Sequence, residues 1–211
     1  MGAAVAEEAR AVDFYVTGFG PFHSVAANPS GEVVRLLPAR LALERAGAPA
    51  TGRAGGPATV RLAGAEVLEV SAAAVGRYLA GAAEGDALHL HLGVDVSAKR
   101  FRLERRAVNE VHFTCPDQQG WQPCHQPIDA SGGRTAAAAL ETGLPVAKLV
   151  DQLRGKGFQV EESHDAGRFV CNYTYYTSLD RCARVGGEAL FLHVPSAKTT
   201  PVRQQLDFVV A

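Results

Sequence analysis

The sequence predicts one α/β domain, in which helices cover both faces of a mostly parallel, twisted sheet. A length of 211 residues suits a single domain. Hydrophobic residues make up 47% and charged residues 20% of the chain, as is typical of globular proteins with a sizeable core. Short apolar runs alternate with segments of helical periodicity, and this alternation favours parallel strands joined by helices. In such folds, sites lie beyond the carboxyl ends of the strands.

The first half of the chain alternates strand and helix. A β-favouring run at residues 12–17 is followed by Gly and Pro at 18–22, which predict a loop. Ser30 is a candidate N-cap for a helix from about Glu32 that ends at Pro38 or restarts beyond it. The further elements are an exposed connection at 47–57, a strand at 66–71, a helix at 72–83 and an apolar strand at 87–93.

The second half continues the alternation. It predicts a helix at 145–155, a strand at 158–162, a helix at 172–184 and a buried strand at 189–194. We find no internal repeat. We therefore expect one domain over residues 1–211, with a flexible N-terminal segment at 1–11.

Charge and apolar patterning disfavour several classes of partner. Lys and Arg number 21 against 22 Asp and Glu, so a net charge of -1 gives no built-in attraction to nucleic acid or anionic lipid. No apolar run approaches the ~18 residues that a membrane span needs. The N-terminus lacks the apolar core of a secretory signal. Four cysteines are too few for a disulfide scaffold, so we expect reduced thiols and a cytoplasmic location.

Cys171 follows the apolar pair Phe169 and Val170 at the point where a helix could begin. The positive end of a helix dipole favours a thiolate, and free backbone N–H groups there can hold an oxyanion. A buried structural cysteine is the default interpretation of one cysteine taken alone. Position alone leaves both interpretations open.

His193 lies near the end of the apolar strand predicted at 189–194, which would bring its imidazole to the carboxyl edge of the sheet. The alternative is a core histidine bonded to a backbone carbonyl. His89, His91 and His112 share this ambiguity. Glu104 lies among arginines and would by default be a solvated ion-pair partner. The patterns alone therefore do not decide whether the protein is a Cys–His enzyme.

Four sequence blocks occur in order between about Asp13 and Pro195. They are VTGFGPF at 16–22, LER at 103–105, DAGRFVCN at 165–172 and LHVP at 192–195. The NPS tripeptide at 28–30 and the Pro and Gly pattern of 116–128 add independent anchors. Together these blocks resemble pyroglutamyl-peptidase I, a family of cytosolic cysteine peptidases. The Gly-Phe-Gly within the first block is not a dinucleotide fingerprint, because the third glycine is missing.

The resemblance implies a three-layer α/β/α fold of the phosphorylase/hydrolase-like kind and an exopeptidase that removes N-terminal pyroglutamyl residues from small peptides. It implies that Cys171 is the nucleophile, His193 the base and Glu104 the residue that orients His193, with a thioester intermediate. It implies no metal and no organic cofactor.

The resemblance also assigns a substrate pocket. Its expected residues are Phe19, Phe22, Asn28, Cys115, Phe169 and Val170. Phe19 and Phe22 could instead be ordinary core residues, but two aromatics in a Gly- and Pro-rich turn favour the pocket. Val94 departs from the Gln often found in bacterial members of the family, so one hydrogen bond to the substrate is absent or replaced.

Alternatives to this assignment remain. A zinc site could involve His112, Cys115, Cys124 and His125, but the adjacent second pair fits no common zinc finger, so we expect no metal. A non-catalytic pyroglutamyl-peptide binding module would need no triad, and the intact Cys, His and Glu argue against it. A nucleoside phosphorylase is disfavoured because no phosphate-binding loop is visible. Both a monomer and a homotetramer are compatible with the sequence.

Overall fold

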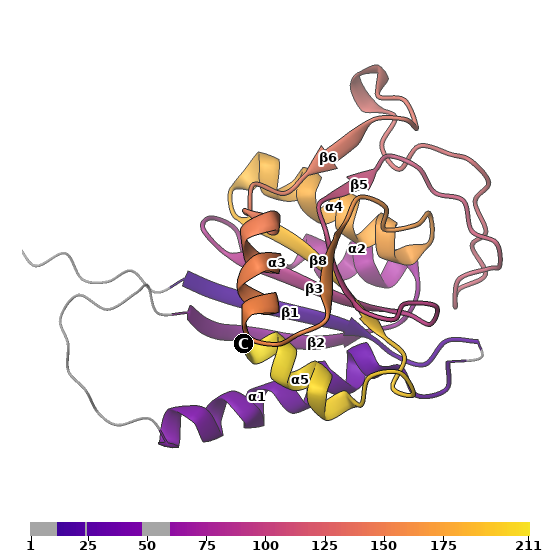
Figure 1. Cartoon of the computed structure of the whole chain (residues 1–211). Coiled ribbons are helices and arrows are strands. Elements are labelled where there is room, and N and C mark those ends of the chain that lie inside the picture. Colours follow the sequence, from indigo (N-terminus) through magenta and orange to yellow (C-terminus); the bar gives the residue numbers. More distant parts are fainter. Residues whose placement is uncertain (1–11, 24, 48–59) are drawn as a thin grey trace, which may run out of the picture.

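The computed structural model of the chain describes residues 12–23, 25–47 and 60–211. The segment expected to be flexible, 1–11, and the expected connection at 47–57, apart from Gly47, lie outside the described residues. A six-stranded sheet lies between two layers of helices (Figure 1). The α/β class with a mostly parallel sheet is therefore confirmed.

The sheet is parallel over four strands and reverses direction at the fifth. Across the sheet the strands are β2 (Val60–Leu68), β1 (Val12–Phe19), β3 (Leu88–Asp95), β8 (Glu188–Pro195), β4 (Phe101–Glu104) and β7 (Val160–Ser163). Strand β4 pairs antiparallel with β8, and β7 pairs parallel with β4. Strand β8 is central, buried and almost entirely apolar, as expected for a strand covered on both faces.

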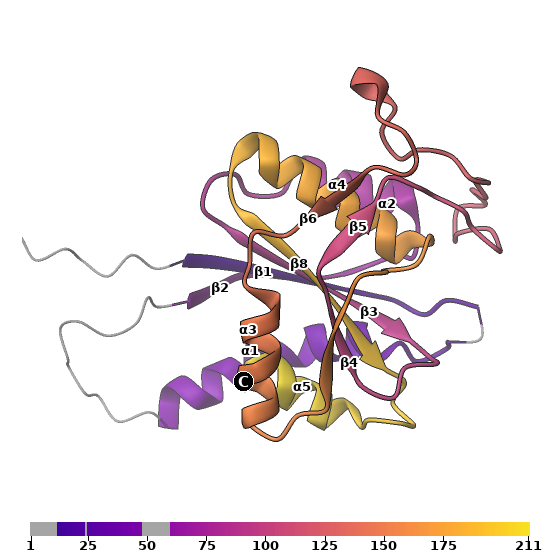
Figure 2. The ribbon, with the colours of Figure 1, turned by 45° about the horizontal axis from the view of Figure 1, so that its top comes forward.

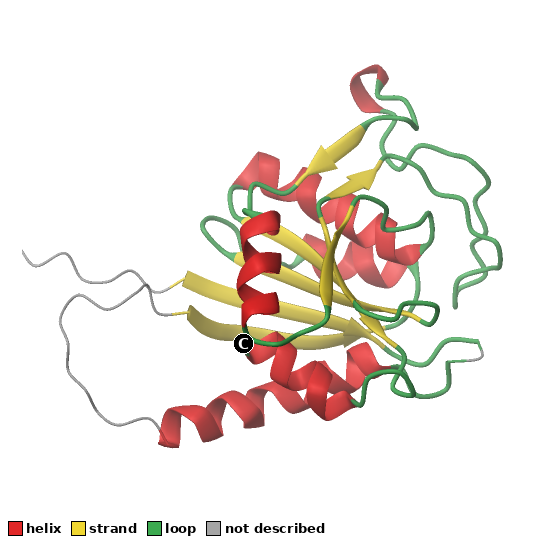
Figure 3. Cartoon of the chain, in the orientation of Figure 1, coloured by secondary structure: helices red, strands yellow, loops and turns green. Residues whose placement is uncertain are grey.

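Helices cover both faces of this sheet (Figures 1 and 2). One face carries α1 (Pro29–Gly47), α3 (Val146–Gly155) and α5 (Val202–Val210), and the other carries α2 (Ala72–Ala80) and α4 (Val170–Val185). Each layer encloses its own apolar core against the sheet. A ribbon of β5 (Arg106–Val108) and β6 (Ala139–Glu141) lies beside α4, and a long loop joins its two strands (Figure 3).

The junction of β1 and α1 differs from the prediction. Strand β1 continues through Gly18 and Phe19, which pair with β2, so the strand ends later than the predicted residue 17. Gly18 allows this because a methyl group there would collide with the carbonyl of Ser30. The N-cap is Asn28 and not Ser30, since Asn28 Oδ1 accepts the Ser30 N–H at 3.2 Å.

The remaining differences concern the ends and the short strands. Helix α1 continues through Pro38 to Gly47, so the proline does not end it. The strand predicted at 66–71 begins earlier, at Val60, and ends at Leu68. Strands β4, β5 and β6 were not predicted from the sequence. Each has only three or four residues and contains charged side chains, which conceal the apolar pattern of a buried strand.

Candidate active site

Cys171 occupies the first turn of α4. Phe169 is extended and precedes the helix, and the Tyr173 N–H donates to the Phe169 carbonyl at 3.1 Å. The N–H groups of a first helical turn have no acceptors within the helix, and the dipole is positive there. The helix begins at Val170, two residues before the predicted start at Asn172. Cys171 is therefore the second residue of the helix.

Asn172, the neighbour of Cys171, holds this end of α4 in place. Its buried side chain accepts from the Val108 N–H at 2.9 Å and donates to the carbonyls of Val108 and Glu110 at 2.8 and 2.9 Å. These bonds fix the first turn of α4 against β5. Sequence reasoning missed this role, although a polar residue directly after the predicted nucleophile in a matched block was a usable signal.

His193 lies on β8 between Gly93 of β3 and Arg102 of β4. Its Nδ1 is 2.8 Å from Glu104 Oε1. When the ring is neutral, a carboxylate in this position keeps the proton on Nδ1 and leaves Nε2 as the acceptor. Burial lowers the pKa of His193, but hydrogen bonds to Cys171 and Glu104 outweigh burial and raise it to about 10.

Glu104 is fully buried, at 0% exposure, so the default interpretation as a solvated ion-pair partner is wrong. The antiparallel pairing of β4 with β8 places Glu104 beside Phe191 and diagonal to His193. Its backbone carbonyl accepts the Tyr175 hydroxyl at 2.7 Å. Burial and the Glu104 charge both raise the pKa of Tyr175, so this phenol stays neutral and keeps donating.

Gly93 is a further residue that sequence reasoning did not identify. A Cβ atom there would lie 2.9 Å from Cys171 Sγ and 2.8 Å from Phe191 Cζ. A Cβ atom does not come this close to another atom, so a side chain at position 93 would displace the Cys171 thiol or the Phe191 ring. Glycine at this position therefore allows the thiol to reach His193, its neighbour on β8.

We expect Gly93→Ala to lower kcat/KM about 100-fold, because displacing the thiol by a fraction of an ångström disrupts its alignment with His193. Gly76→Ala is the matched control, since a Cβ on Gly76 of α2 meets no atom within 4 Å. Steady-state kinetics of both variants test the expectation. Wild-type activity in Gly93→Ala would show that the thiol does not need this approach.

An apolar cavity of about 470 Å³ opens beside Cys171. All six predicted pocket residues line it together with Cys171: Phe19, Phe22, Asn28, Cys115, Phe169 and Val170. Its walls also include His23, Val25, Val70, Val94, Val96 and Thr114. The Phe22 and Phe169 rings lie 5.2 Å apart, centre to centre. Phe19 is 3% exposed and also belongs to a core, so the pocket and core interpretations both apply to it.

Asn28 contributes one of the polar groups of this cavity. Its Nδ2 donates to the Gly20 carbonyl at 2.9 Å, and its Oδ1 accepts from the Ser30 backbone and hydroxyl. Nδ2 carries a second hydrogen. Asn28 therefore fixes the turn that carries Phe19 and Phe22 and has one donor left.

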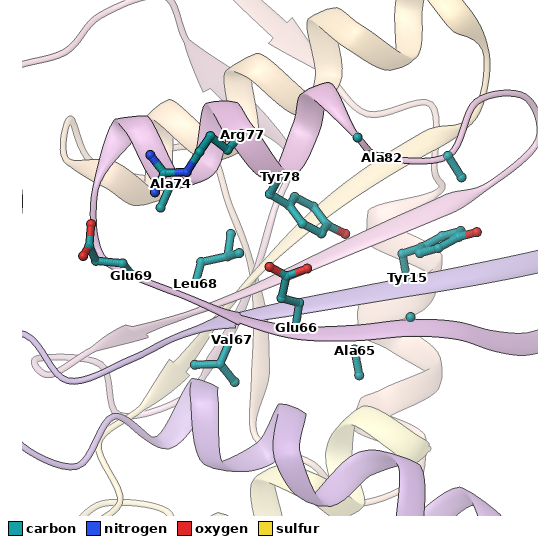
Figure 4. A pocket seen from close by; sticks show the side chains of 13 residues that line it. Tyr15, Ala65, Glu66, Val67, Leu68, Glu69, Ala74, Arg77, Tyr78 and Ala82 are labelled. Atoms are coloured by element: carbon teal, nitrogen blue, oxygen red, sulfur yellow. The ribbon is translucent and has the colours of Figure 1, made fainter.

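A larger cavity of about 760 Å³ lies elsewhere, along β2 and α2. Figure 4 shows the Glu66 side chain pointing toward Tyr78, with Tyr15 to one side of them. Burial and the Glu66 charge raise the pKa of Tyr78 to about 12. The cavity contains no cysteine or histidine, so its size does not make it the site of thiol chemistry.

The two buried histidines of β3 are core residues. His91 lies between the hydroxyls of Thr17 and Ser178, at 2.7 and 2.9 Å. Burial lowers its pKa to about 3, so it is neutral. His89 is 2% exposed and stacks on Tyr15. Among these residues, only His193 contacts a thiol and a carboxylate together.

We expect kcat/KM to fall as pH rises through about 10, because the predicted role of His193 as a proton donor to the leaving group needs its protonated form. The raised pKa also means that His193 contributes stability fully below about pH 6.5 and loses it as pH rises through about 10. Glu104→Gln removes the negative charge that helps to keep His193 protonated. The fall of kcat/KM at alkaline pH should therefore occur at a lower pH in this variant. Glu141→Gln, an exposed carboxylate beside Arg105, is the control. If the pH at which kcat/KM falls were the same in Glu104→Gln and in the wild type, the pairing of Glu104 with His193 would be contradicted.

Comparisons with known proteins identify relatives along nearly the whole described chain. The pyroglutamyl peptidase family model matches residues 12–205. Pyrrolidone-carboxylate peptidase of Klebsiella pneumoniae (strain 342) is 32% identical over 212 residues, covering 93% of this chain and 90% of the relative. The protein of the same name from Streptococcus pneumoniae (strain 70585) is 34% identical over 182 residues, covering 85% and 76%.

Solved structures agree with this similarity. The pyrrolidone carboxyl peptidase of Thermus thermophilus superposes with a TM-score of 0.68 at 30% identity, covering 93% of this chain and 96% of that one. That of Fervidobacterium islandicum gives a TM-score of 0.74 at 26% identity, covering 94% and 95%. Among the described residues, no helix is both long and apolar enough to cross a membrane. Because the family model spans the sheet, both helical layers and the Cys171–His193 pair, the chain belongs to the pyroglutamyl peptidase family of cysteine peptidases.

Proposed function

We propose that this chain hydrolyses the amide bond after an N-terminal pyroglutamyl residue, with Cys171, His193 and Glu104 as its catalytic residues. The observation that carries the proposal is the contact of a helix-start thiol with a carboxylate-bound imidazole at the wall of an apolar cavity. Such a pair is the arrangement that activates a thiol nucleophile.

The reaction follows from these positions. His193 Nε2 takes the proton of the Cys171 thiol. The thiolate attacks the carbonyl carbon of the amide bond that joins the pyroglutamyl residue to the next residue. The free N–H groups of the first turn of α4 stabilise the resulting oxyanion. The imidazolium gives its proton to the departing amine, which leaves a thioester. His193 then takes a proton from water, the hydroxide displaces Cys171, and pyroglutamate leaves. The steps use side chains and backbone N–H groups of this chain together with one water molecule, and need neither metal nor cofactor.

The cavity fits the neutral lactam ring of pyroglutamate. Phe19, Phe22 and Phe169 supply apolar walls for the ring carbons, and the remaining Asn28 donor can bind the ring carbonyl. Val94 lines the cavity and offers no side-chain hydrogen bond. The natural substrates are small peptides, and a thiol enzyme of this kind suits the reducing cytoplasm.

We expect kcat/KM for a pyroglutamyl coumarin substrate to exceed that for prolyl or glutaminyl coumarins by tenfold to hundredfold or more. An N-terminal ammonium would enter a largely apolar cavity, where burying even one unpaired polar group costs about 1–3 kcal/mol. Prolyl substrates test the lactam group separately from the ring shape, because they keep the ring, lack its carbonyl and carry an ammonium. Comparable values for all three would contradict a lactam pocket. Binding of the pyroglutamyl ligand without turnover would instead support the non-catalytic alternative.

A further inference from the structure

The long loop between β5 and β6 brings two histidines together through local strand pairing. Val111 and Gln126 exchange backbone hydrogen bonds of 2.8 and 3.0 Å, and the Phe113 N–H donates to the Pro123 carbonyl at 2.9 Å. This pairing places His112 opposite His125. Their rings stack with centres 4.0 Å apart and planes 10° apart.

Cys124 completes a cluster with these two histidines. One ligand atom from each of His112, Cys124 and His125 lies within 4.8 Å of the other two. Cys115, the fourth residue considered in the sequence, lies instead in the apolar cavity beside Cys171. The cluster is separate from the catalytic residues, and none of its members lines that cavity.

The polar atoms of the cluster are arranged as for a metal ion. His112 Nδ1 is buried and has no hydrogen-bond partner among the described residues. His125 Nδ1 is 2.7 Å from Glu110 Oε1, and Arg168 Nε donates to Glu110 Oε2 at 2.8 Å. A carboxylate on one ring nitrogen leaves the other nitrogen as a lone-pair donor, which is the usual support of a metal-binding histidine.

We propose that His112, Cys124 and His125 bind a zinc-like divalent transition-metal ion, with water as the fourth ligand. Two imidazoles and one thiolate form a nitrogen and sulfur set suited to zinc. Ligand atoms around tetrahedral zinc lie roughly 3.5 Å apart, given bonds of about 2.0–2.3 Å, so ligand atoms that now lie up to 4.8 Å apart must move closer together. The exposed Cys124 and His125 can make this movement, in which the His125 ring tilts out of the stack and keeps its bond to Glu110.

The site would stabilise the wall of the substrate cavity. The His112 N–H donates to the Arg168 carbonyl at 3.0 Å, and the neighbouring Phe113 ring packs on Phe169 at 4.5 Å. A bound ion would therefore tie the loop to the segment that leads into α4. We expect it to raise the melting temperature and to leave kcat nearly unchanged, because it contacts no reacting atom.

Cobalt(II) titration of the full-length Cys171→Ala protein tests this proposal, because that background removes the catalytic thiol as a competing ligand. We expect one ion per chain, thiolate-to-cobalt charge-transfer absorption, the visible bands of a tetrahedral site, and displacement by zinc. Cys124→Ser in the same background should abolish the charge-transfer band. Cys115→Ser and His164→Ala, which alter residues outside the cluster, should retain it.

Two further measurements separate this proposal from the proposed peptidase activity. Glu110→Gln should weaken cobalt binding by about 10- to 100-fold without abolishing it. In the wild-type protein, a chelator should lower the melting temperature and leave hydrolysis intact. A charge-transfer band that survives Cys124→Ser, or no cobalt spectrum in the Cys171→Ala protein, would overturn the metal site whatever the hydrolysis assays show.

Discussion

Replacing Cys171 by Ala should lower kcat for pyroglutamyl substrates by about 10⁴-fold or more, because no other group at this position can form the thioester. The fold should survive. Alanine favours helices, and Cys171 is only partly buried in the first turn of α4. Hydrolysis of a pyroglutamyl coumarin measures the first effect, and thermal unfolding followed by circular dichroism measures the second.

The other three cysteines provide controls for this prediction. Cys115→Ala and Cys124→Ala should tolerate the change better than Cys171→Ala, because neither thiol is a hydrogen-bond partner of His193 among the described residues. Cys115 lines the cavity, so its loss should act on KM more than on kcat. Cys182 is buried, and burial raises the pKa of its thiol, so it is a poor nucleophile at neutral pH. An alkylating reagent should therefore inactivate the enzyme through Cys171 alone. Undiminished hydrolysis by Cys171→Ala, or inactivation that tracks modification of Cys124 or Cys182, would reject this nucleophile.

The second large effect should come from His193→Ala, which we expect to be almost inactive. This variant loses both the base for the thiol and the acid for the leaving amine. Glu104→Gln should retain more activity, because its amide oxygen can still accept the Nδ1 proton at the position of Glu104 Oε1. Comparing kcat and KM of both variants tests this ranking. Wild-type rates in both would remove the two residues from the mechanism.

The sequence predicted those parts of the fold in which pattern and environment agree. The apolar run that became β8 and the helical segment that became α4 were found, because β8 is buried on both faces and α4 has a buried apolar side. Strand β4 was missed because it has only four residues, two of them the charged Arg102 and Glu104. Burial of Glu104 depends on the antiparallel pairing of β4 with β8, a long-range contact that local pattern does not encode.

The candidate site likewise contains residues that the sequence could predict and residues that only the structure reveals. The resemblance to a known family supplied Cys171, His193 and Glu104 together with the pocket residues. Gly93 could not be found from pattern, because the need for glycine arises only where β3, β8 and α4 meet. The cluster of His112, Cys124 and His125 was judged by spacing along the chain, whereas strand pairing brings its members together.

Trapping the covalent intermediate tests the central claim most directly. Wild-type protein mixed with a pyroglutamyl coumarin, quenched in acid within one turnover and digested, should yield a peptide containing Cys171 that is heavier by one pyroglutamyl group. The adduct should be absent in Cys171→Ala and should disappear as turnover ends. Single-turnover release of coumarin with no adduct on Cys171, or with the adduct on another residue, would contradict the proposed thioester mechanism.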